Sequence, residues 1–559
     1  MARWCFSESA TGGQKIKLTL RIAAKGVPKL GRRLVIFRKL PVLDVRHDNL
    51  GFFFSDAARR FPDRIAIVDL WGNNERRYTY AELEMRTQSA AAFLQSIGMV
   101  AGERIALLVG NRCEYIEAFF GAMRAGLVVV PLNVAQAEAN IEFMVRDSGS
   151  SGMILDPNAC PAGIAVAEHL GLRHRVIMDE APPAGWVAYE SANRLRGSRY
   201  ASAPSPDGIA FQPYTAGSTG KPKGARLTHV GMLWSIRSTQ EHWPTDKEEV
   251  GLVAVPLFHK NAMRGTIKPN LFVGAKAVLQ PRFEPRAFLS ALARQRATFC
   301  GGVPAIFSMI LPHADLIRSL DFSALKLISI GSAVVLDELV QHLEALFPSA
   351  KVKESYGLTE GGGPLRAPLD GRPVPRGSSG VAAPGYEVRL VGSDGSQNAQ
   401  EGELWTRSPC VSAGYHNRPD LTRERIVDGW LRTGDIFRVD AEGFFFFRGR
   451  VDDMFSCGGE NIYPREVESL LLTHTDVIDV CVVPIPHHIK GFVPAAMVVL
   501  RPQARVSIEE LSRFTLAKGP AYAHPRRIQA VDAIPLTAAG KPDKRLVQSS
   551  LVSGPAALP

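Results

Sequence analysis

The segment from Tyr214 to Gly224, YTAGSTGKPKG, concentrates residue types that suit the binding of a polyphosphate. Its glycines let the backbone turn tightly and present N–H groups to an anion, while its hydroxyls donate hydrogen bonds and its lysines add positive charge. These residues are Thr215, Gly217, Ser218, Thr219, Gly220, Lys221, Lys223 and Gly224. The segment is not a Walker A loop, because Pro222 stands where that motif requires Ser or Thr. A flexible surface loop is the alternative interpretation.

Two shorter motifs could bind the rest of a nucleotide. Tyr356–Glu360, YGLTE, follows a strand-like run and holds an aromatic ring, a glycine, a hydroxyl and a carboxylate. These groups could stack on a base, allow a bend, donate to a phosphate and bind Mg²⁺. Leu431–Asp435, LRTGD, places an acid directly after a glycine, where it could accept hydrogen bonds from ribose hydroxyls. Either motif alone is more often a simple turn, so the interpretation depends on their occurring together.

Two further motifs lie nearer the C-terminus. Gly449–Asp453, GRVDD, is followed by Ser456–Pro464, SCGGENIYP, and Gly540–Arg545, GKPDKR, comes close to the end of the chain. A single lysine in such a basic tail would normally be solvated and without function. Lys541 is therefore a candidate only in combination with the other motifs.

Alternating strand and helix patterns supply the elements that must position these motifs. From residue 103, the apolar runs RIALLVG, LVVVPL and SGMILD alternate with amphipathic helical segments. The same rhythm continues at 251–255, 276–279, 326–330 and 351–353. It predicts an α/β fold with layered, mostly parallel sheets. Short strands after residue 385 predict a small β-rich unit, and a compact α+β region follows from about residue 453.

The overall composition narrows the class of protein. The chain has 559 residues, too many for one ordinary core, and is 46% hydrophobic and 22% charged, as is typical of a soluble globular protein. No apolar run reaches the roughly 18 residues that a membrane span needs. Seven scattered cysteines without a C-x-x-C pair indicate reduced thiols, which predicts a cytoplasmic location. The near-neutral body of the chain argues against a nucleic-acid partner.

Together and in this order, the five motifs resemble those of the adenylate-forming superfamily, which contains acyl-CoA synthetases, peptide-synthetase adenylation domains and luciferases. The resemblance covers about residues 50–548. It implies a large N-terminal domain followed by a small, mobile α+β C-terminal lid domain. It also implies the reaction: a small carboxylic acid and ATP, with Mg²⁺, form an acyl-adenylate and pyrophosphate, and the acyl group then passes to coenzyme A. We predict a basic extension at 1–46, an adenylate-forming domain at 47–451 and the lid at 452–559.

The resemblance also implies roles for individual residues. Tyr356 and Gly357 would contact adenine, and Asp435 would hold the ribose hydroxyls with help from Arg450. Thr359 would contact the α-phosphate, Glu360 would bind Mg²⁺, and Lys541 would contact both the substrate carboxylate and the α-phosphate. The remaining ATP-binding residues would be Thr215, Ala216, Gly217, Ser218, Thr219, Gly220, Lys221, Lys223, Gly331, Ser332 and Ala333. Asp452 would be the hinge between the domains, and the CoA site would comprise Ser456, Gly458, Gly459 and Glu460.

Some positions depart from the pattern of the family. Ala216-Gly-Ser218 stands where Ser-Gly-Thr is more frequent, and Gly331-Ser-Ala333 replaces a commoner Gly-Gly-Ala. Leu431 occupies a position that is often aromatic, and Phe455-Ser-Cys457 replaces a β-branched/Ser pair. None of these changes removes a group that the chemistry needs.

The identity of the acid is less constrained. By resemblance, the acyl pocket is lined by His259, Asn261, Val303 and Gly331. Amino-acid-activating relatives place an Asp in this region, whereas this chain has no acid there, which predicts an uncharged apolar tail and therefore a fatty acid. An aryl or alicyclic acid is the alternative. His259 would be a gate between the acyl and CoA channels or, alternatively, a packed core histidine.

The acceptor and the presence of activity have alternatives too. The Ser456–Pro464 motif is closer to the CoA-ligase version than to the peptide-synthetase version, so CoA is the expected acceptor. A free-standing carrier protein is the alternative acceptor. A non-catalytic binding protein is disfavoured, because Lys541, Glu360 and Asp435 are intact.

Residues 1–46 differ from the rest of the chain in charge. They hold eleven Lys/Arg and two acidic residues, a net charge of +9, whereas the remaining 513 residues carry only +2. Apolar residues interleave with the basic ones, so we predict peripheral contact with an anionic membrane surface. A disordered tail, an organelle transit peptide and an upstream start codon are the alternatives. Gly26, Pro28 and Gly31 interrupt any long helix in this segment.

Overall fold

A computed structural model of the protein describes residues 48–72, 75–195, 208–215, 222–331, 335, 337–458, 460–536 and 542–553. The extension at 1–46 lies outside these residues, so its membrane contact stays a prediction. Among the described residues, no helix is long and apolar enough to cross a membrane.

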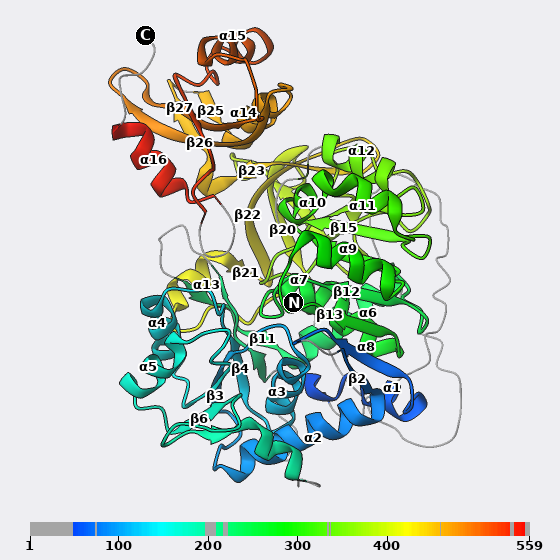
Figure 1. Ribbon diagram of the computed structural model, residues 1–559. Helices are drawn as coiled ribbons and strands as arrows, with labels where there is room; N and C mark the ends of the chain where they lie inside the picture. The colour runs from blue at the N-terminus through cyan, green and yellow to red at the C-terminus, as the bar shows by residue number, and fades with distance from the viewer. Residues whose placement is uncertain are drawn as a thin grey trace, which may run out of the picture. The chain divides into compact units, whose positions relative to one another are not determined.

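Two large sheets form most of the chain before residue 360 (Figure 1). The first has the order β11 (Leu227–Thr228), β8 (Ile209–Phe211), β4 (Val128–Pro131), β3 (Arg104–Leu108), β5 (Gly152–Leu155), β6 (His174–Ile177) and β7 (Val187–Ala188). The second has the order β16 (Lys351–Ser355), β15 (Leu327–Gly331), β14 (Phe299–Gly302), β12 (Val250–Val253), β13 (Lys276–Leu279), β1 (Ile65–Asp69) and β2 (Arg76–Thr79). Most neighbouring strands are parallel; β11 and β2 at the edges are antiparallel. The predicted layered α/β sheets are confirmed.

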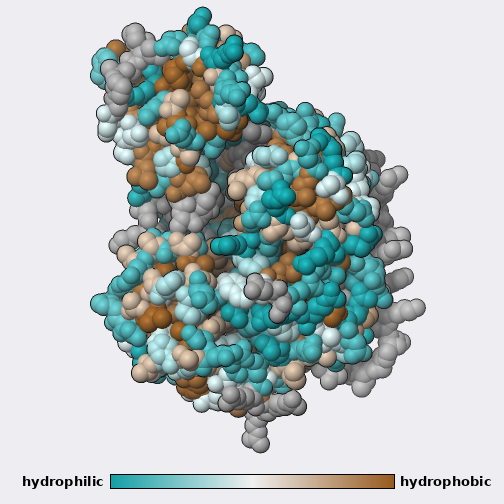
Figure 2. All heavy atoms as spheres, viewed as in Figure 1, coloured by the Kyte–Doolittle hydropathy of each residue, from teal (hydrophilic) through white to brown (hydrophobic). Residues whose placement is uncertain are grey.

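Helices cover the outer face of each sheet. In the first sheet, α4 (Glu138–Ser148) and α5 (Ala162–His169) share a core with β3, β4 and β5. In the second, the apolar sides of four helices pack on the strands: α9 (Pro285–Arg294), α10 (Pro304–Ile310), α11 (Ala314–Ser319) and α12 (Asp337–Leu346). Hydrophilic residues occupy much of the visible surface around these four helices (Figure 2). The strands are short apolar runs because helices bury both of their faces.

A helical layer joins the two sheets. Helix α2 (Tyr80–Ser96) begins with a capping box formed by Thr79 and Glu82 and contacts β1, whereas α3 (Cys113–Arg124) contacts β3 and β4. Every residue of α3 is buried. Asp69, at the end of β1, accepts a 2.9 Å hydrogen bond from the backbone N–H of Cys113. The chain therefore places α2 and α3 between the sheets.

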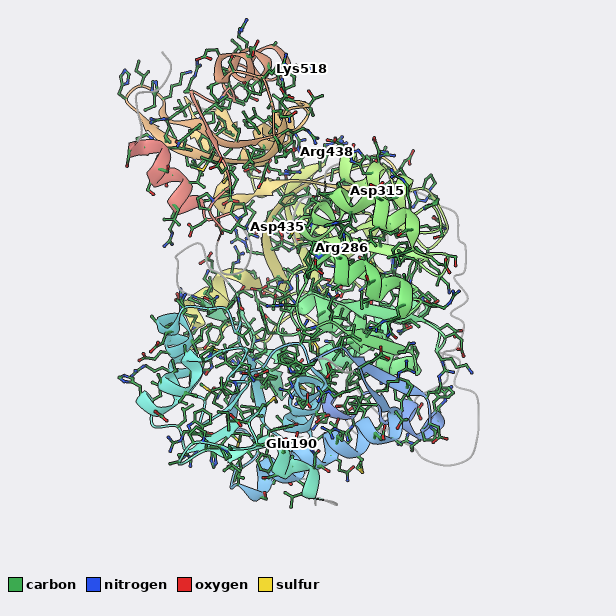
Figure 3. All side chains as sticks on the ribbon, viewed as in Figure 1. Glu190, Arg286, Asp315, Asp435, Arg438 and Lys518 are labelled. Atoms are coloured by element: carbon green, nitrogen blue, oxygen red, sulfur yellow. The ribbon has the colours of Figure 1, made fainter. Side chains whose placement is uncertain are left out.

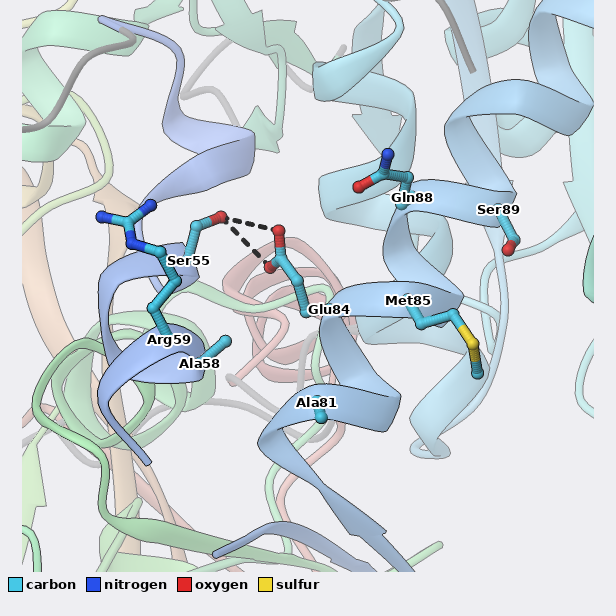
Figure 4. A pocket seen from close by; sticks show the side chains of 8 residues that line it. All are labelled: Ser55, Ala58, Arg59, Ala81, Glu84, Met85, Gln88 and Ser89. Carbon is cyan, nitrogen blue, oxygen red and sulfur yellow. Dashed lines mark hydrogen bonds between the residues drawn. The ribbon is translucent and has the colours of Figure 1, made fainter. Parts of the chain in front are cut away.

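A groove between α1 (Ser55–Arg60) and α2 lies outside the predicted site (Figure 4). Glu84 in this groove accepts hydrogen bonds from Ser55 at 2.9 Å and from the buried Arg124 at 2.6 Å. Because the carboxylate is already bonded and none of the predicted site residues lines the groove, we interpret the groove as structural.

The expected β-rich unit is an antiparallel sheet with its own small core. It contains β19 (Glu387–Val391), β20 (Glu401–Arg407), β22 (Trp430–Val439), β21 (Ile426–Val427) and β23 (Phe445–Arg450). Helix α13 (Pro419–Arg425) precedes β21, and α6 (His229–His242), α7 (Lys260–Ala262) and α8 (Lys268–Val273) belong to the preceding region. A π-helical turn, Met263–Ile267, joins α7 to α8.

The C-terminal region is a separate α+β domain with its own hydrophobic core. Its sheet contains β25 (Glu460–Ile462), β24 (Phe455–Cys457), β27 (Gly491–Leu500), β26 (Val477–His487) and β28 (Arg527–Val531). Its helices are α14 (Pro464–Leu472), α15 (Ile508–Lys518) and α16 (Lys544–Ser553). The α+β class of this domain agrees with the prediction from the sequence.

Candidate active site

The carboxyl ends of the parallel strands β14, β15 and β16 bring several predicted residues to one edge of the second sheet. Gly331 ends β15 opposite Ser355, which ends β16, and Tyr356–Glu360 follow directly. Val303 follows β14 and caps α10. A side chain at Gly331 has no room, because a Cβ there would lie 2.3 Å from the Ser355 hydroxyl. In open α/β sheets, ligands bind in the crevice outside such strand ends.

Asp435 connects this edge to the β-rich unit. Its Oδ2 accepts a 2.6 Å hydrogen bond from the Tyr356 hydroxyl, and its Oδ1 accepts a 2.8 Å bond from Arg450. Arg450 on β23 is the direct register partner of Asp435 on β22; Figure 3 labels Asp435. Burial raises the pKa of Asp435, and the Arg450 guanidinium opposes that rise. Three predicted motifs thus meet at one carboxylate that is only 6% exposed.

Glu360 joins the phosphate-binding motif to the same edge. Its Oε1 accepts 3.1 Å hydrogen bonds from the hydroxyls of Thr215 and Tyr415. Thr359 and Glu360 lie in a tight turn closed by paired backbone hydrogen bonds between Leu358 and Gly362. The hydroxyl, carboxylate and backbone groups of this turn therefore lie beside the first residue of the predicted phosphate loop.

The phosphate-binding motif is described only at its ends. Thr215 and Lys223 are antiparallel partners in the short strands β9 (Tyr214–Thr215) and β10 (Lys223–Gly224). Burial lowers the pKa of Lys223, and Arg425 and Arg418 lower it further. The predicted site residues outside the described part of the chain are Ala216, Gly217, Ser218, Thr219, Gly220, Lys221, Ser332, Ala333, Gly459 and Lys541.

Glu360 is compatible with a bound Mg²⁺. Both of its hydroxyl contacts reach Oε1, and no described residue donates a hydrogen bond to Oε2. No group of three or more His, Cys, Asp or Glu in the described part of the chain could hold a metal by itself. Mg²⁺ in nucleotide enzymes is commonly bound by one or two carboxylates together with substrate phosphates, so a single carboxylate fits this ion.

The predicted hinge and CoA residues lie in and next to the C-terminal domain. Asp452 is in the 3-10 turn Val451–Asp453, and its carboxylate is 4.0 Å from Arg450. Ser456 and Glu460 belong to the paired strands β24 and β25, between which Gly458 has a positive φ of 60°. A left-handed conformation of this kind favours glycine. The turn of the β24–β25 hairpin therefore contains a glycine, Gly458, in a left-handed conformation.

Two of the predicted acyl-pocket residues are close neighbours. His259 caps α7 and accepts a 3.3 Å hydrogen bond from the backbone N–H of Asn261 through Nδ1. The Asn261 side chain faces Gly301 of β14, where a Cβ would lie 3.9 Å from its Oδ1. Both residues therefore lie near the carboxyl end of β14, as Val303 does.

Sequence analysis missed Arg264, which lies in the π-helical turn. Its guanidinium packs against Gly357 and Gly363: a Cβ at those positions would lie 2.5 Å from Nη1 and 1.6 Å from Nη2. The two glycines thus make room for this side chain beside Tyr356. The sequence offers one signal for this residue: Arg264 stands three residues after Asn261, which is one of the predicted acyl-pocket residues.

A second missed residue, Lys268, is buried close to Arg264. Only 5% of Lys268 is exposed, and its ammonium lies 5.7 Å from the centre of the Phe211 ring. Burial lowers the pKa of Lys268 to about 8, and Arg264 lowers it further. Arg366 is partly buried, and desolvation and the nearby Arg264 lower its pKa to about 10.

Comparison with known proteins identifies the family. Residues 54–416 match the AMP-binding enzyme family, and residues 466–541 match the AMP-binding enzyme C-terminal domain. The chain is 32% identical over 505 residues to the feruloyl-CoA synthase of an Amycolatopsis species, which covers 89% of this chain and 98% of that relative. It is 29% identical over 532 residues to the long-chain-fatty-acid–CoA ligase of Bacillus subtilis (strain 168), which covers 89% and 94%. The crystal structure of the anthranilate CoA ligase AuaEII with anthranoyl-AMP has a TM-score of 0.82 at 24% identity and covers 90% of this chain and 98% of that one.

The fold and these matches define an adenylate-forming enzyme. The chain belongs to the AMP-binding enzyme family, in its acyl-CoA synthetase branch. It is a ligase that forms a carbon–sulfur bond, an AMP-forming acid–CoA ligase with ATP and CoA as substrates. The family, the fold class and the class of enzyme predicted from the sequence are confirmed.

Replacing Lys268 with methionine is expected to raise the free energy of unfolding of the ligand-free protein by about 1–3 kcal/mol near pH 7, because it removes a buried charge that has no acidic partner among the described residues. The folded-state pKa of Lys268, about 8, lies below the usual 10.5, so the cost in the wild type is fully present below pH 8. Between pH 8 and pH 10.5 the unfolded chain binds more protons than the folded chain. The free energy of unfolding of the wild type therefore rises with pH toward that of the Lys268→Met variant.

Urea-induced unfolding at several pH values from 7 to 10.5 would measure this difference. Lys326→Met is a suitable control, because Lys326 is 65% exposed and pairs with Glu249 at 2.8 Å, an interaction with little effect on stability. A Lys268→Met variant less stable than the wild type, or a difference that does not shrink as pH rises, would contradict the account.

Proposed function

We propose that the enzyme adenylates its acid at the carboxyl ends of β14–β16, where Tyr356 and Asp435 hold the nucleoside, Thr215 and Thr359 contact its phosphates and Glu360 binds Mg²⁺. The observation that carries this proposal is the bonding of one buried carboxylate, Asp435, to both Tyr356 and Arg450. An incoming ribose can exchange its hydroxyls for the Tyr356 hydroxyl, because carboxylate oxygens accept from either donor. The phenol ring, released from that bond, is then available for stacking on adenine.

Charge neutralisation is the main task of the site. The carboxylate of the acid must approach an α-phosphate while both carry negative charge, so cations placed at this point lower the barrier. Mg²⁺, when bound at Glu360 together with ATP, supplies part of that charge. We assign the remainder to Lys541, with Lys221 and Lys223 on the other phosphates.

We propose that the acid is a compact one with polar substituents. The sequence predicts a fatty acid, with an aryl or alicyclic acid as the alternative. The polar side chains of Asn261, beside Gly301 of β14, and of Arg264, beside Gly357, favour the alternative. An alkyl chain packed against an unpaired guanidinium would gain little from that contact. The similarity to a feruloyl-CoA synthase supports an aryl acid, whereas the similarity to a long-chain-fatty-acid–CoA ligase supports the original prediction.

A panel of carboxylic acids, assayed for AMP formation with ATP and CoA, tests this proposal. We expect acid-dependent AMP formation that is faster with substituted aromatic acids than with unbranched fatty acids. Pyrophosphate release that occurs without thioester would favour a carrier-protein acceptor over CoA. Failure of every acid to release pyrophosphate would contradict ligase activity.

Thioester formation, the second half-reaction, requires a different set of residues around the acyl-adenylate, because the CoA thiol must enter while water is excluded. We propose that the C-terminal domain rotates about Asp452, which moves Lys541 away and brings the hairpin that contains Ser456, Gly458, Gly459 and Glu460 to the adenylate. Asp453 forms a 2.7 Å ion pair with Lys544 in α16, so the segment that follows the hinge is anchored within the C-terminal domain.

Lys541→Ala is expected to slow adenylation by about 10²–10⁴-fold, because one cation beside a transferring phosphoryl group contributes roughly 3–5 kcal/mol. Thioester formation from synthetic acyl-adenylate should be preserved, since Lys541 is withdrawn at that stage. Single-turnover assays of the two half-reactions separate these effects. Near-normal overall turnover in the variant would show that Lys541 has been assigned wrongly.

Asp452→Pro is expected to slow thioester formation by roughly tenfold or more and to leave adenylation within a few-fold of the wild type. The 3-10 turn Val451–Asp453 has a backbone that proline tolerates, so the folded protein accepts the change, but proline prevents the φ rotation that a hinge needs. Asp453→Pro, which places a proline one residue further along the same turn, is the control for a general effect of proline at this turn. Equal loss of both half-reactions in Asp452→Pro would place the hinge elsewhere.

A further inference from the structure

The helical segment from Lys260 to Val273 carries two basic side chains on one face. Arg264 lies in the π-helical turn and Lys268 follows it four residues later, at the spacing that places side chains next to each other on a helix. Single π-helical turns occur frequently at functional sites. Arg264 packs against Gly357, which directly follows Tyr356 in the chain, and against Gly363.

Neither basic group has an acidic partner among the residues that the structure describes. The charged or ionisable groups close enough to shift the pKa of Lys268 are Arg264 and the thiol of Cys410. Arg366 donates a 3.0 Å hydrogen bond to Thr239 and a 3.3 Å bond to the carbonyl of Gly363, and its nearest charged neighbour is Arg264. The buried Lys268 and the partly buried Arg264 and Arg366 therefore lie near one another, and none of the three has an ion pair with a carboxylate among the described residues.

The described groups next to Arg366 include His242, Tyr386 and Cys410. Arg366 and Lys353 lower the pKa of His242, which burial already depresses, to about 4, so this imidazole is neutral at physiological pH. Tyr386 donates to or accepts from Cys410 at 3.3 Å and accepts a 3.1 Å bond from the backbone N–H of Gly363. Among the described residues, the groups that shift the pKa values of His242 and Lys268 are cations and a thiol, and none is a carboxylate.

A buried cation without a counter-charge is costly, and apolar residues of similar volume would pack the same space at lower cost. Cations retained in such a place beside a substrate site are more readily explained by an anion that binds there. The position relative to the chemistry fits this explanation, because Gly357 and Gly363 bracket the turn that holds Thr359 and Glu360.

We propose that the acid activated by this enzyme carries a second anionic group, a carboxylate at its far end, which binds to Arg264 and Lys268. The substrate class is then a dicarboxylic acid: one carboxylate is adenylated and the other forms ion pairs with Arg264 and Lys268. This inference rests on the proposed function and extends it from polar acids to anionic ones. A dicarboxylic acid departs from the uncharged apolar tail that the sequence predicts. That prediction depends on the absence of an acidic residue from the predicted acyl pocket.

The test compares pairs of acids that match in shape and differ in charge. 4-Carboxycinnamate and 4-methylcinnamate form a rigid pair, and hexanedioate and hexanoate form a flexible pair. For the wild type we expect the kcat/KM for AMP formation to favour the diacid in at least one pair by about tenfold or more. Arg264→Met and Lys268→Met should each lower the kcat/KM of the diacid by about 10- to 100-fold more than that of the matched monoacid.

Controls separate this effect from a loss of structure. Arg318→Met changes an arginine whose side chain is 68% exposed, and it should leave the ratio unchanged. Monoacid turnover and the thermal unfolding temperature report whether each variant is folded. In a thermal unfolding assay with ATP present, the diacid should raise the unfolding temperature of the wild type more than that of Arg264→Met.

The outcomes distinguish this inference from the proposed function on which it rests. If no acid in either pair, nor in the wider panel, yields AMP, the proposed function itself fails. If monoacids are activated but the wild type prefers them to the matched diacids, the inference is wrong and the proposed function stands. The inference is also wrong if Arg264→Met lowers the turnover of the diacid and of its matched monoacid equally, because the arginine then does not discriminate by charge.

Discussion

The buried carboxylate of Asp435 is the interaction on which the arrangement of the site depends. A carboxylate that is 6% exposed needs donors for both oxygens, and it has them: Tyr356 from the end of the parallel sheet and Arg450 from the neighbouring antiparallel strand. These partners lie 79 and 15 residues away in the sequence. The β-rich unit is thereby connected to the strand ends at which we propose that adenylation occurs. Loss of either donor would leave a buried charge incompletely compensated.

Close packing at the strand ends imposes a second constraint. Gly331, Gly357 and Gly363 each lie where a Cβ would overlap a neighbouring side chain or backbone atom. At Gly331 the neighbour is Ser355 of the adjacent strand, and at the other two positions it is the guanidinium of Arg264. Glycine at these positions lets the nucleotide-binding turn lie against the helical segment that carries Arg264. The geometry of the proposed nucleotide site and the position of the Arg264 guanidinium are therefore linked through Gly357 and Gly363.

Much of the fold could be predicted from the sequence, because its parallel strands are continuous apolar runs separated by helical patterns. The runs that became β3, β4 and β5 and the antiparallel strands after residue 385 were recognised in this way. The motifs that contain Tyr356, Asp435 and Glu360 were also identified, because unusual residue combinations at short spacing are visible in the chain itself.

The pairing of these motifs and the buried cations could not be predicted. Contacts between Tyr356 and Asp435, or between Thr215 and Glu360, depend on sheet order and register rather than on local sequence. Arg264 and Lys268 look like the polar side of a surface helix, and only the packing of neighbouring elements shows that Lys268 is buried. The π-helical turn that contains Arg264 likewise has no clear signature in the sequence.

The equilibrium affinity for ATP of an Asp435→Asn variant tests the central claim most directly. The change keeps the shape of the side chain and removes the charge that accepts hydrogen bonds from Tyr356, Arg450 and, by this account, the ribose. Asp440→Asn is the matched control, because Asp440 on the turn after β22 accepts hydrogen bonds from the backbone N–H groups of Glu442 at 3.0 Å and Phe444 at 2.9 Å, away from the predicted site. Isothermal titration calorimetry should show that Asp435→Asn weakens ATP binding by about tenfold or more while the Asp440→Asn variant binds normally. A folded Asp435→Asn protein that binds ATP as tightly as the wild type would contradict the account.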